Sequence, residues 1–518
     1  MRKFFKIIFS RYTVCAVFIL IELAIMAVLS FVASEISGAF ALIGRVISLA
    51  VFVSLINKDT NPEFKLTWLA IAAISPVFGS VLYLVFSSRQ MTVSEKGFLS
   101  NLFCRIREAK NGCKTHERTA AALDALSKES FSLAGRAYSV LGDDPLAELY
   151  PSGVLSYYRT GEDMYSAMLS AIEQAKSYIF LEYFIIEEGE MWQGIYDVLV
   201  RKAEKGVDVR ILYDDIGTMS TLPQDFDKKL RRIGIKCYRF AKITPALKSS
   251  HNNRDHRKIC VVDGEIAFTG GMNVADEYVN KKRRFGNWKD GGIGVRGGAA
   301  RGFACLFLSL YDMTVRAFSD YDSFLAAPEE SAEWNGGYVI PFGSGPQPMY
   351  SEPVGKNALI GIIGAAERYL YVTTPYLIVD YDLTEALRRA ARRGVDVRII
   401  TPAIPDKKMI KIMTKSSYPY LIRAGVRIFE YTPGFIHEKC VVCDDTVAMV
   451  GTINLDYRSL VHHFEDALLI FRDPVIEDIR NGFLETEGKS VAISGEAAKL
   501  SFSEKALRNV MRIIAPLL

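Results

Sequence analysis

One sequence pattern occurs twice in this chain: residues 256–273 read HRKICVVDGEIAFTGGMN, and residues 437–454 read HEKCVVCDDTVAMVGTIN. Both copies keep His-x-Lys, then an Asp at the same distance, then Gly-x-x-Asn. Ordinary composition would produce a His-x-Lys-x4-Asp match roughly once per ten thousand positions or less often. Two matches with the same continuation indicate an internal duplication. We therefore expect an enzyme with one site built from two halves.

The sequence around the two copies alternates between strand and helix patterns in the same order. A predicted strand at 177–186 precedes a predicted helix at 191–205, and the second half repeats this order at 368–378 and 383–393. Gly-Val-Asp-Val-Arg follows the helix in both halves. Strands that alternate with helices favour an α/β fold. We expect two duplicated halves whose mostly parallel sheets meet at a shared active site.

The N-terminal region differs in composition from the rest of the chain. It contains apolar runs at 13–33, 39–56 and 66–86, and the first and third are long enough to cross a bilayer. The middle run carries Arg45, and a third span, a re-entrant segment and an interfacial helix are all compatible with it. Basic residues flank both ends of the region, which is typical of an even number of crossings. We expect transmembrane helices before the two halves.

The domain boundaries follow from these patterns. The 518 residues are 50% hydrophobic, which is enough apolar material for a large core. The formal net charge of +4 is small for such a chain and argues against a nucleic-acid binder. We expect a membrane region of two or three hydrophobic segments over 1–88, a basic linker over 89–149, a first half over 150–345 and a second half over 346–518.

The eight cysteines do not form a disulfide or zinc pattern. Cys440 and Cys443 make a single C-x-x-C pair on a predicted buried strand, without a second pair or a suitable histidine arrangement. Core packing explains that pair better than metal or redox chemistry.

The repeated histidines and lysines suit displacement at phosphorus. On a strand, His256 and Lys258 share one face, and so do His437 and Lys439. In such a displacement one imidazole can attack phosphorus while the other protonates the leaving oxygen, and the two ammonium groups can hold the anionic oxygens. This chemistry needs no metal.

Four acids accompany these groups. Asp263 and Asp444 complete the motifs, but their odd offset from the histidines predicts that they face the opposite side of the strand. Asp290 and Glu465 lie downstream and are better candidates to orient the imidazoles. The candidate catalytic residues are His256, Lys258, Asp263, His437, Lys439 and Asp444.

The two copies resemble the paired motifs of the phospholipase D superfamily. Within it, residues 254–259, 270–271, 431–437 and 451–460 are similar to those of bacterial cardiolipin synthases. The resemblance covers nearly the whole chain, including the apolar N-terminus. The chain departs from the family pattern in having three apolar runs rather than two, and in Gly residues at 291–292 where bulkier residues are common.

The resemblance implies transfer of a phosphatidyl group from one phosphatidylglycerol to another, which gives cardiolipin and glycerol without a cofactor. It implies that His256 is the nucleophile and His437 the general acid and then base, although the near-equivalent halves also allow the reverse. Asn273 and Asn454 would help the lysines to bind phosphoryl oxygens. The implied partners are phosphatidylglycerol and anionic membrane lipid, not nucleic acid, and the implied location is the bacterial cytoplasmic membrane, as a multi-pass protein.

Other interpretations stay open. The same histidines serve a membrane-bound phospholipase D that uses water, or a transphosphatidylase that uses another headgroup. A scaffold without activity would not require four matched reactive residues. The basic run at 281–284 is compatible with headgroup binding and with a solvated face. His462 and His463 beside Glu465 have poor metal spacing, so a supporting role is simpler. The stretch at 505–518 suits a membrane-surface helix or an ordinary terminal helix.

Overall fold

The computed structural model describes residues 38–58, 61–86, 92–112, 146–243, 252–325, 336–495 and 501–517, with scattered positions in 17–32 and 121–144. Contacts divide the chain into two compact units. The smaller unit combines residues 1–91, 241–253 and 502–518, and the larger one combines residues 92–240 and 254–501. Both motif copies lie in the larger unit.

The smaller unit is helical. Its helices are α3 (Gly38–Asn57), α4 (Pro62–Ile74), α5 (Pro76–Phe86), α19 (Phe502–Ile514) and the short η4 (Ala515–Leu517). A small core holds α3, α4 and α5 together, where Trp68 and Tyr83 meet edge to face at 5.6 Å between ring centroids. Asn61 caps α4 by accepting a hydrogen bond from the backbone N–H of Glu63.

The apolar run at 66–86 forms two helices rather than one. It breaks at Ser75, because Pro76 has no N–H to continue the helical ladder and instead begins α5. The run at 39–56 lies within α3, whereas the run at 13–33 falls on residues that the structure describes only at scattered positions. Among the described helices, none has both the length and the apolar character that a membrane crossing needs.

The C-terminal helix α19 has an apolar face open to solvent. Phe502, Val510 and Ile513 of this helix are exposed, whereas its Met511 and the adjoining Ala515 of η4 are buried. Lys505, Arg508 and Arg512 lie on the remaining surface of the same helix.

The first half of the larger unit is built on a seven-stranded sheet in the order β2-β8-β7-β6-β3-β4-β5. Its strands are β2 (Val154–Tyr158), β3 (Tyr178–Tyr183), β4 (Asp208–Asp214), β5 (Lys236–Phe240), β6 (Lys258–Val262), β7 (Ile266–Gly270) and β8 (Gly292–Arg296). Its helices are α9 (Gly161–Gln174), α10 (Glu190–Glu204), α11 (Asp215–Thr218), α12 (Phe226–Arg232), η2 (Asp276–Val279), α13 (Ala300–Val315) and α14 (Tyr321–Leu325), and α6 (Val93–Gly112) precedes them.

The second half is built on a nine-stranded sheet in the order β1-β9-β17-β15-β14-β10-β12-β13-β18. Its strands are β1 (Tyr150–Pro151), β9 (Tyr338–Ser344), β10 (Tyr369–Thr373), β12 (Asp396–Pro402), β13 (Arg427–Tyr431), β14 (Cys440–Cys443), β15 (Val447–Gly451), β17 (Glu465–Phe471) and β18 (Ser490–Ala492). A two-stranded sheet pairs β11 (Leu377–Ile378) with β16 (Leu455–Asp456). The helices are α15 (Val354–Gly364), α16 (Tyr381–Arg392), α17 (Lys408–Ile422), η3 (Arg458–His462) and α18 (Val475–Gly488).

The duplicated α/β halves are confirmed, but the expectation of mostly parallel sheets is wrong. Parallel pairing joins only β3 to β4 and β4 to β5 in the first sheet, and β10 to β12 and β12 to β13 in the second. All the other strand pairs of these two sheets are antiparallel. The reason is local: the tight turn at 263–265 folds β6 back on β7, and the turn at 444–446 does the same for β14 and β15.

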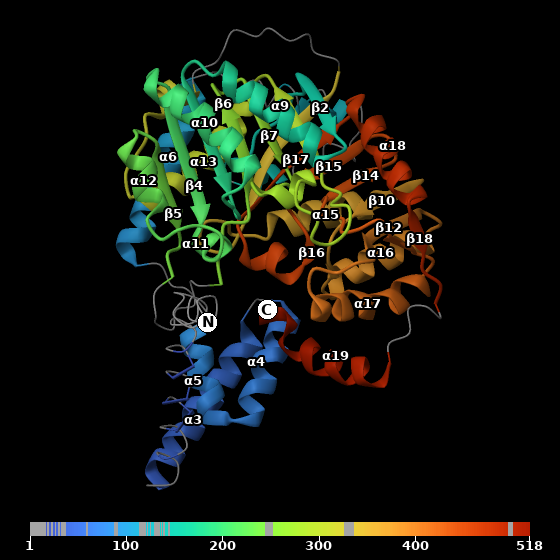
Figure 1. Ribbon diagram of the computed structural model, residues 1–518. Coiled ribbons are helices and arrows are strands. Elements are labelled where there is room, and N and C mark those ends of the chain that lie inside the picture. The colour runs from blue at the N-terminus through green and yellow to red at the C-terminus, as the bar shows by residue number, and fades with distance from the viewer. Residues whose placement is uncertain are drawn as a thin grey trace, which may run out of the picture. The chain divides into compact units, whose positions relative to one another are not determined.

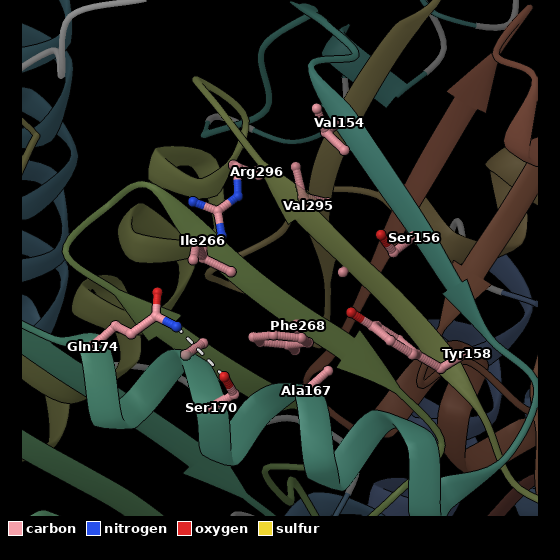
Figure 2. Close-up of a pocket in the computed structure, with 12 residues that line it drawn as sticks. Val154, Ser156, Tyr158, Ala167, Ser170, Gln174, Ile266, Phe268, Val295 and Arg296 are labelled. Carbon is pink, nitrogen blue, oxygen red and sulfur yellow. Dashed lines mark hydrogen bonds between the residues drawn. The ribbon is translucent and has the colours of Figure 1, made fainter. Parts of the chain in front are cut away.

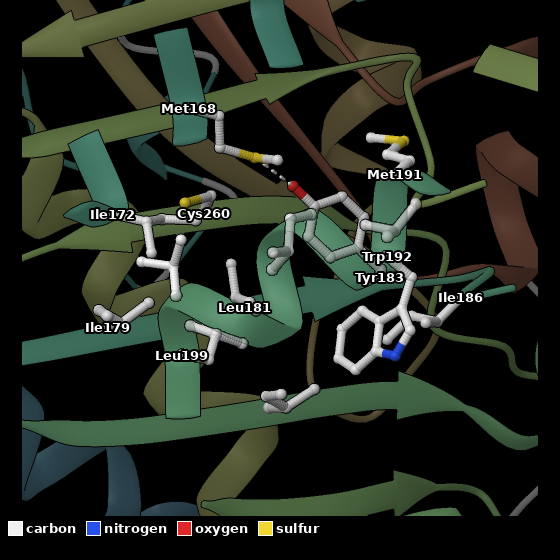
Figure 3. Packing of buried hydrophobic residues seen from close by; sticks show 14 of the residues in the cluster. Met168, Ile172, Ile179, Leu181, Tyr183, Ile186, Met191, Trp192, Leu199 and Cys260 are labelled. Atoms are coloured by element: carbon white, nitrogen blue, oxygen red, sulfur yellow. Dashed lines mark hydrogen bonds between the residues drawn. The ribbon is translucent and has the colours of Figure 1, made fainter. Parts of the chain in front are cut away.

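The core of the first half fills the space between its sheet and the helices α9 and α10 (Figure 3). Helix α10 buries Met191, Trp192, Ile195 and Leu199 at helical spacing, against strand residues such as Leu181. The two sheets lie side by side in the larger unit, and contacts between β7 and β17 join them (Figure 1). The edge where they meet is where both motif copies are found.

Candidate active site

Each motif histidine is bound through its backbone to the other half of the chain. The N–H of His256, just before β6, donates to the carbonyl oxygen of Phe464 at 2.8 Å. The N–H of His437, just before β14, donates to the carbonyl oxygen of Lys289 at 2.8 Å. The structure therefore repeats one exchange of hydrogen bonds on both sides of a pseudo-twofold axis.

The side chain of each motif histidine also contacts an acidic side chain from the other half. Nδ1 of His256 lies 2.9 Å from Oε2 and 3.0 Å from Oε1 of Glu465. Nδ1 of His437 lies 2.9 Å from Oδ2 of Asp290. A carboxylate at Nδ1 favours the ring tautomer that carries its hydrogen there. Nε2 is then the nitrogen of each ring that is left for chemistry.

The two orienting acids have different surroundings. Glu465 also accepts hydrogen bonds from the hydroxyls of Ser459, at 2.6 Å, and Thr452. Burial raises its pKa well above 4.5, more than Lys258 and these hydroxyls lower it. Burial also acts on Asp290, but His437 and Lys439 outweigh it and leave the pKa of Asp290 below 3.8. The acid that faces His437 is thus the more firmly ionised one.

The motif lysines lie against the backbone of their own histidines. Nζ of Lys258 donates to the carbonyl oxygen of His256 at 2.7 Å, and Nζ of Lys439 donates to that of His437. Nζ of Lys439 is also 2.9 Å from Nδ1 of His437. Both lysines are buried, and burial lowers the pKa of Lys258 to about 8 and of Lys439 to about 7. The site holds cations that titrate near neutral pH.

Burial also sets the charge of the imidazoles. It lowers the pKa of His256 well below 6.5, and Lys258 lowers it further. It lowers the pKa of His437 to about 4 in the same way, with Lys439 as the next cause. Both rings are therefore neutral at pH 7 when no anion is bound.

The motif aspartates bind backbone amides at the start of neighbouring strands. Asp263 accepts from the N–H groups of Lys176, Ser177 and Tyr178 at 2.7 to 2.8 Å, next to β3. Asp444 accepts from residues 367–369, next to β10. Both aspartates have positive φ, 54° and 55°, in the turns that end β6 and β14. The structure places these carboxylates at the outer ends of the strands.

The two motif asparagines differ. Oδ1 of Asn273 accepts from the N–H of Ile185 at 3.0 Å, and its Nδ2 donates to the hydroxyl of Tyr278 at 2.7 Å. Asn454 is buried, and its Oδ1 has no hydrogen-bond partner among the described residues. The structure thus brings Asn454 to the site with an unused acceptor, whereas the polar atoms of Asn273 are engaged.

Sequence reasoning missed a buried charged layer behind His256. Arg257 is fully buried, donates to the hydroxyl of Tyr350 at 2.7 Å, and lies 3.8 Å from Glu182. Asp466 accepts from the N–H of Lys258 at 3.0 Å and from the hydroxyl of Thr269 at 2.5 Å. The only sequence signal was position, because Arg257 and Asp466 are immediate neighbours of predicted site residues.

Arg254 supports the same motif from the preceding segment. Its guanidinium lies 2.8 Å from Oδ1 of Asp214, and both side chains are almost fully buried. Asp214 also accepts from the N–H of Asp255, so the strand end of β4 is tied to the residues that precede His256.

Three possible ligands for a metal ion gather at one histidine. One donor atom each from His256, His463 and Glu465 lies within 4.8 Å of the others. Both oxygens of Glu465 already accept from hydroxyl groups and from His256. The arrangement is a hydrogen-bonded network centred on a carboxylate, and its geometry does not require an ion.

Two other features lie outside the histidine pair. In the basic run, Lys281 and Lys282 pair with Glu190 and Glu187 at 2.6 and 2.7 Å. A surface hollow of about 230 Å³ lies between α9 and the strands β2, β7 and β8 (Figure 2). Tyr158, Phe268 and Arg296 line it, and none of the candidate site residues does.

Two family models match the chain. The model described as "Cardiolipin synthase, PLD-like domain" matches residues 168–284 and 359–486, one segment in each half. The model described as "Phospholipase_D-nuclease N-terminal" matches residues 46–87, which include most of α3, α4 and α5.

Individual proteins agree with the family models. A cardiolipin synthase from Geobacillus kaustophilus is 32% identical to this chain, and the aligned region covers 91% of this chain and 92% of the relative's length. An uncharacterized protein from Streptococcus mutans is 38% identical over a region that covers 90% of this chain and 98% of that protein's length. The crystal structure of a phosphatidylserine synthase from Haemophilus influenzae has a similar fold, with a TM-score of 0.55 and 15% identity over 70% of this chain and 93% of its own. The resemblance expected from the repeated motifs is confirmed: this chain belongs to the cardiolipin synthase family of phospholipase D-like proteins.

Proposed function

We propose that this protein is a phosphatidyltransferase that converts two molecules of phosphatidylglycerol into cardiolipin and glycerol. The observation that carries the proposal is the exchange of acids between the halves, which puts two oriented, buried imidazoles and two lysines into one site. The cardiolipin synthases among its relatives support the choice of substrate.

In the first step, Nε2 of His256 attacks the phosphorus of one phosphatidylglycerol. The bond between phosphorus and the glycerol oxygen breaks, and His437 gives that oxygen a proton. Glycerol leaves, and the phosphatidyl group remains bound to His256 as a phosphohistidine. The covalent step divides one difficult displacement into two easier ones.

In the second step, the terminal hydroxyl of another phosphatidylglycerol attacks the phosphohistidine. His437 now takes the proton of that hydroxyl, and the bond between phosphorus and Nε2 of His256 breaks. One phosphodiester replaces another, so the exchange is close to balanced and needs no nucleotide. The protons taken and given by His437 cancel over the cycle.

The different acids support this assignment of roles. Because both rings are neutral without a bound anion, His437 must take up a proton when the anionic phosphodiester binds before it can act as the general acid. The ionised Asp290 stabilises that protonated ring, whereas the raised pKa of Glu465 makes it a weaker counter-charge for His256. A neutral His256 is the better nucleophile. Lys258, Lys439 and the amide group of Asn454 are proposed to hold the phosphoryl group. Asn273 is proposed to position the site through its bonds to Ile185 and Tyr278, and Asp263 and Asp444 to fix the motif strands.

We further propose that the N-terminal region places the site at a membrane. Phosphatidylglycerol and cardiolipin are lipids, the first 88 residues are rich in apolar runs, and α19 has an exposed apolar face beside three basic side chains.

The test uses the purified full-length protein in detergent-lipid micelles with phosphatidylglycerol as the sole lipid. We expect cardiolipin and glycerol in equal amounts, and loss of both with His256→Ala or His437→Ala. Phosphatidic acid as the main product would instead establish a hydrolase. No turnover of phosphatidylglycerol would refute the substrate assignment.

A further inference from the structure

The strand register makes one position beside the site equivalent in the two halves, and the two halves carry different residues there. Gly270 pairs with Gly292 in the first sheet, and Gly451 pairs with Ala467 in the second. Trp288 lies four residues before Gly292, and His463 lies four residues before Ala467. The two residues are therefore equivalent, and each stands two residues before an orienting acid. The pseudo-twofold axis therefore puts an indole in one half where the other half has an imidazole.

Both rings take the same position beside a motif histidine. The ring centroids of Trp288 and His437 are 5.5 Å apart, and so are those of His463 and His256. Nε1 of Trp288 donates to Asp290 at 3.4 Å, and Nδ1 of His463 lies 3.9 Å from Oε1 of Glu465. Each ring thus turns one nitrogen towards the acid that orients the catalytic imidazole.

The difference is a second nitrogen. An indole has one polar atom, which Asp290 satisfies, whereas an imidazole has two. His463 is 8% exposed, and its Nε2 has no hydrogen-bond partner among the described residues. A buried polar atom without a partner destabilises the fold, so its presence needs an explanation. A bound ligand at that atom provides one.

We propose that Nε2 of His463 binds a phosphoryl oxygen of the phosphodiester at His256. This inference rests on the proposed function, because it takes the phosphorus to be at that histidine. His463 would donate to an oxygen that keeps its negative charge throughout the displacement, next to the nitrogen that forms the covalent bond. An anionic oxygen at Nε2 favours the tautomer or the imidazolium with a proton on that nitrogen.

The surroundings of His463 agree with an anion as the ligand. Burial lowers its pKa well below 6.5, and the cations Arg458, Arg254 and Lys258 lower it too. The three cations around this neutral ring favour an anionic ligand at its Nε2. The indole of Trp288 has no second ring nitrogen, so it offers no donor equivalent to Nε2 of His463.

The experiment compares His463→Phe and His463→Gln with His462→Gln as a matched control that changes the adjacent histidine. Binding of orthovanadate, a mimic of five-coordinate phosphorus, is measured by calorimetry on the full-length protein in micelles, and kcat with phosphatidylglycerol is measured in parallel. Loss of a donor to a transition-state oxygen predicts a fall of about 10- to 100-fold in orthovanadate affinity and kcat for His463→Phe. His463→Gln should recover part of both, and His462→Gln should match the wild type.

Unchanged orthovanadate affinity and kcat in His463→Phe would overturn the proposal, and so would a loss that His463→Gln does not recover although it folds. If His463→Phe does not fold, as judged by its thermal unfolding, His463→Asn replaces it with the same expected loss. The proposed function fails separately: a wild type that binds orthovanadate through His463 but makes no cardiolipin would refute the substrate and keep this site.

Discussion

Nδ1 of His256 lies 2.9 Å from Oε2 of Glu465, which follows it in the chain by 209 residues. Glu465→Gln keeps the shape of this acid but removes its charge and its preference for one ring tautomer. We expect kcat to fall about 100- to 10,000-fold, as for other buried acids that orient a catalytic imidazole. Cardiolipin formation from phosphatidylglycerol measures the effect, and Glu187→Gln is the control. An activity within tenfold of wild type would contradict the orienting role.

The equivalent pair in the other half is His437 with Asp290, and it has room because residue 271 is a glycine. A Cβ atom at this position would lie 2.1 Å from Oδ1 of Asp290 and 2.6 Å from the carbonyl oxygen of His437. Gly271→Ala should therefore displace the acid and lower kcat by at least about 100-fold. Gly364→Ala is the matched control, because open space surrounds that glycine. Equal activities of the two variants would show that the site tolerates the displacement.

We expect the side chain of Asp263 to stabilise the folded protein rather than to take part in the reaction. Asp263→Ala removes the acceptor of three backbone N–H groups, two of which are accessible to water. We expect a loss of about 2 to 3 kcal/mol in the free energy of unfolding. Thermal unfolding measures this change, and kcat per folded molecule should stay within about threefold of wild type. A stable but inactive variant would instead show that Asp263 acts directly in the reaction.

The lysines predict how substrate binding depends on pH. With pKa values of about 8 and about 7, Lys258 and Lys439 carry their charge below these values and lose it as the pH rises through them. A phosphodiester stays singly charged across this range, so its affinity should fall from pH 6 to pH 9. Binding of short-chain phosphatidylglycerol to His256→Ala measures this dependence. In Lys439→Gln the part of the fall near pH 7 should disappear, and an unchanged curve would contradict the assignment.

The sequence was sufficient for the order of the elements but not for the direction of the strands. Helical and strand periodicity predicted β3 and α10, and their second copies β10 and α16, close to the observed bounds. The hairpins after the motifs were missed, because a strand that is buried on both faces has the same apolar pattern in parallel and antiparallel pairing. The direction is set by the turn at Asp263, whose φ is positive.

The sequence selects the residues of the candidate site but not the contacts between them. The repeated spacing selected the two histidines and their lysines, and Asp290 and Glu465 were selected as orienting acids. Which acid serves which histidine depends on how two sheets pack, and no local pattern encodes that. His463 was the least predictable, because its importance lies in a comparison with Trp288 that only the strand register reveals.

The exchange of acids between the halves also limits how the repeats can diverge. A substitution at Glu465 acts on His256, which belongs to the other repeat. Neither repeat can therefore lose its acid, or shift the strand that carries it, without affecting the histidine of the other repeat. Duplicated genes usually free one copy to change. In this chain the imidazole of each repeat depends for its orientation on an acid that the other repeat supplies.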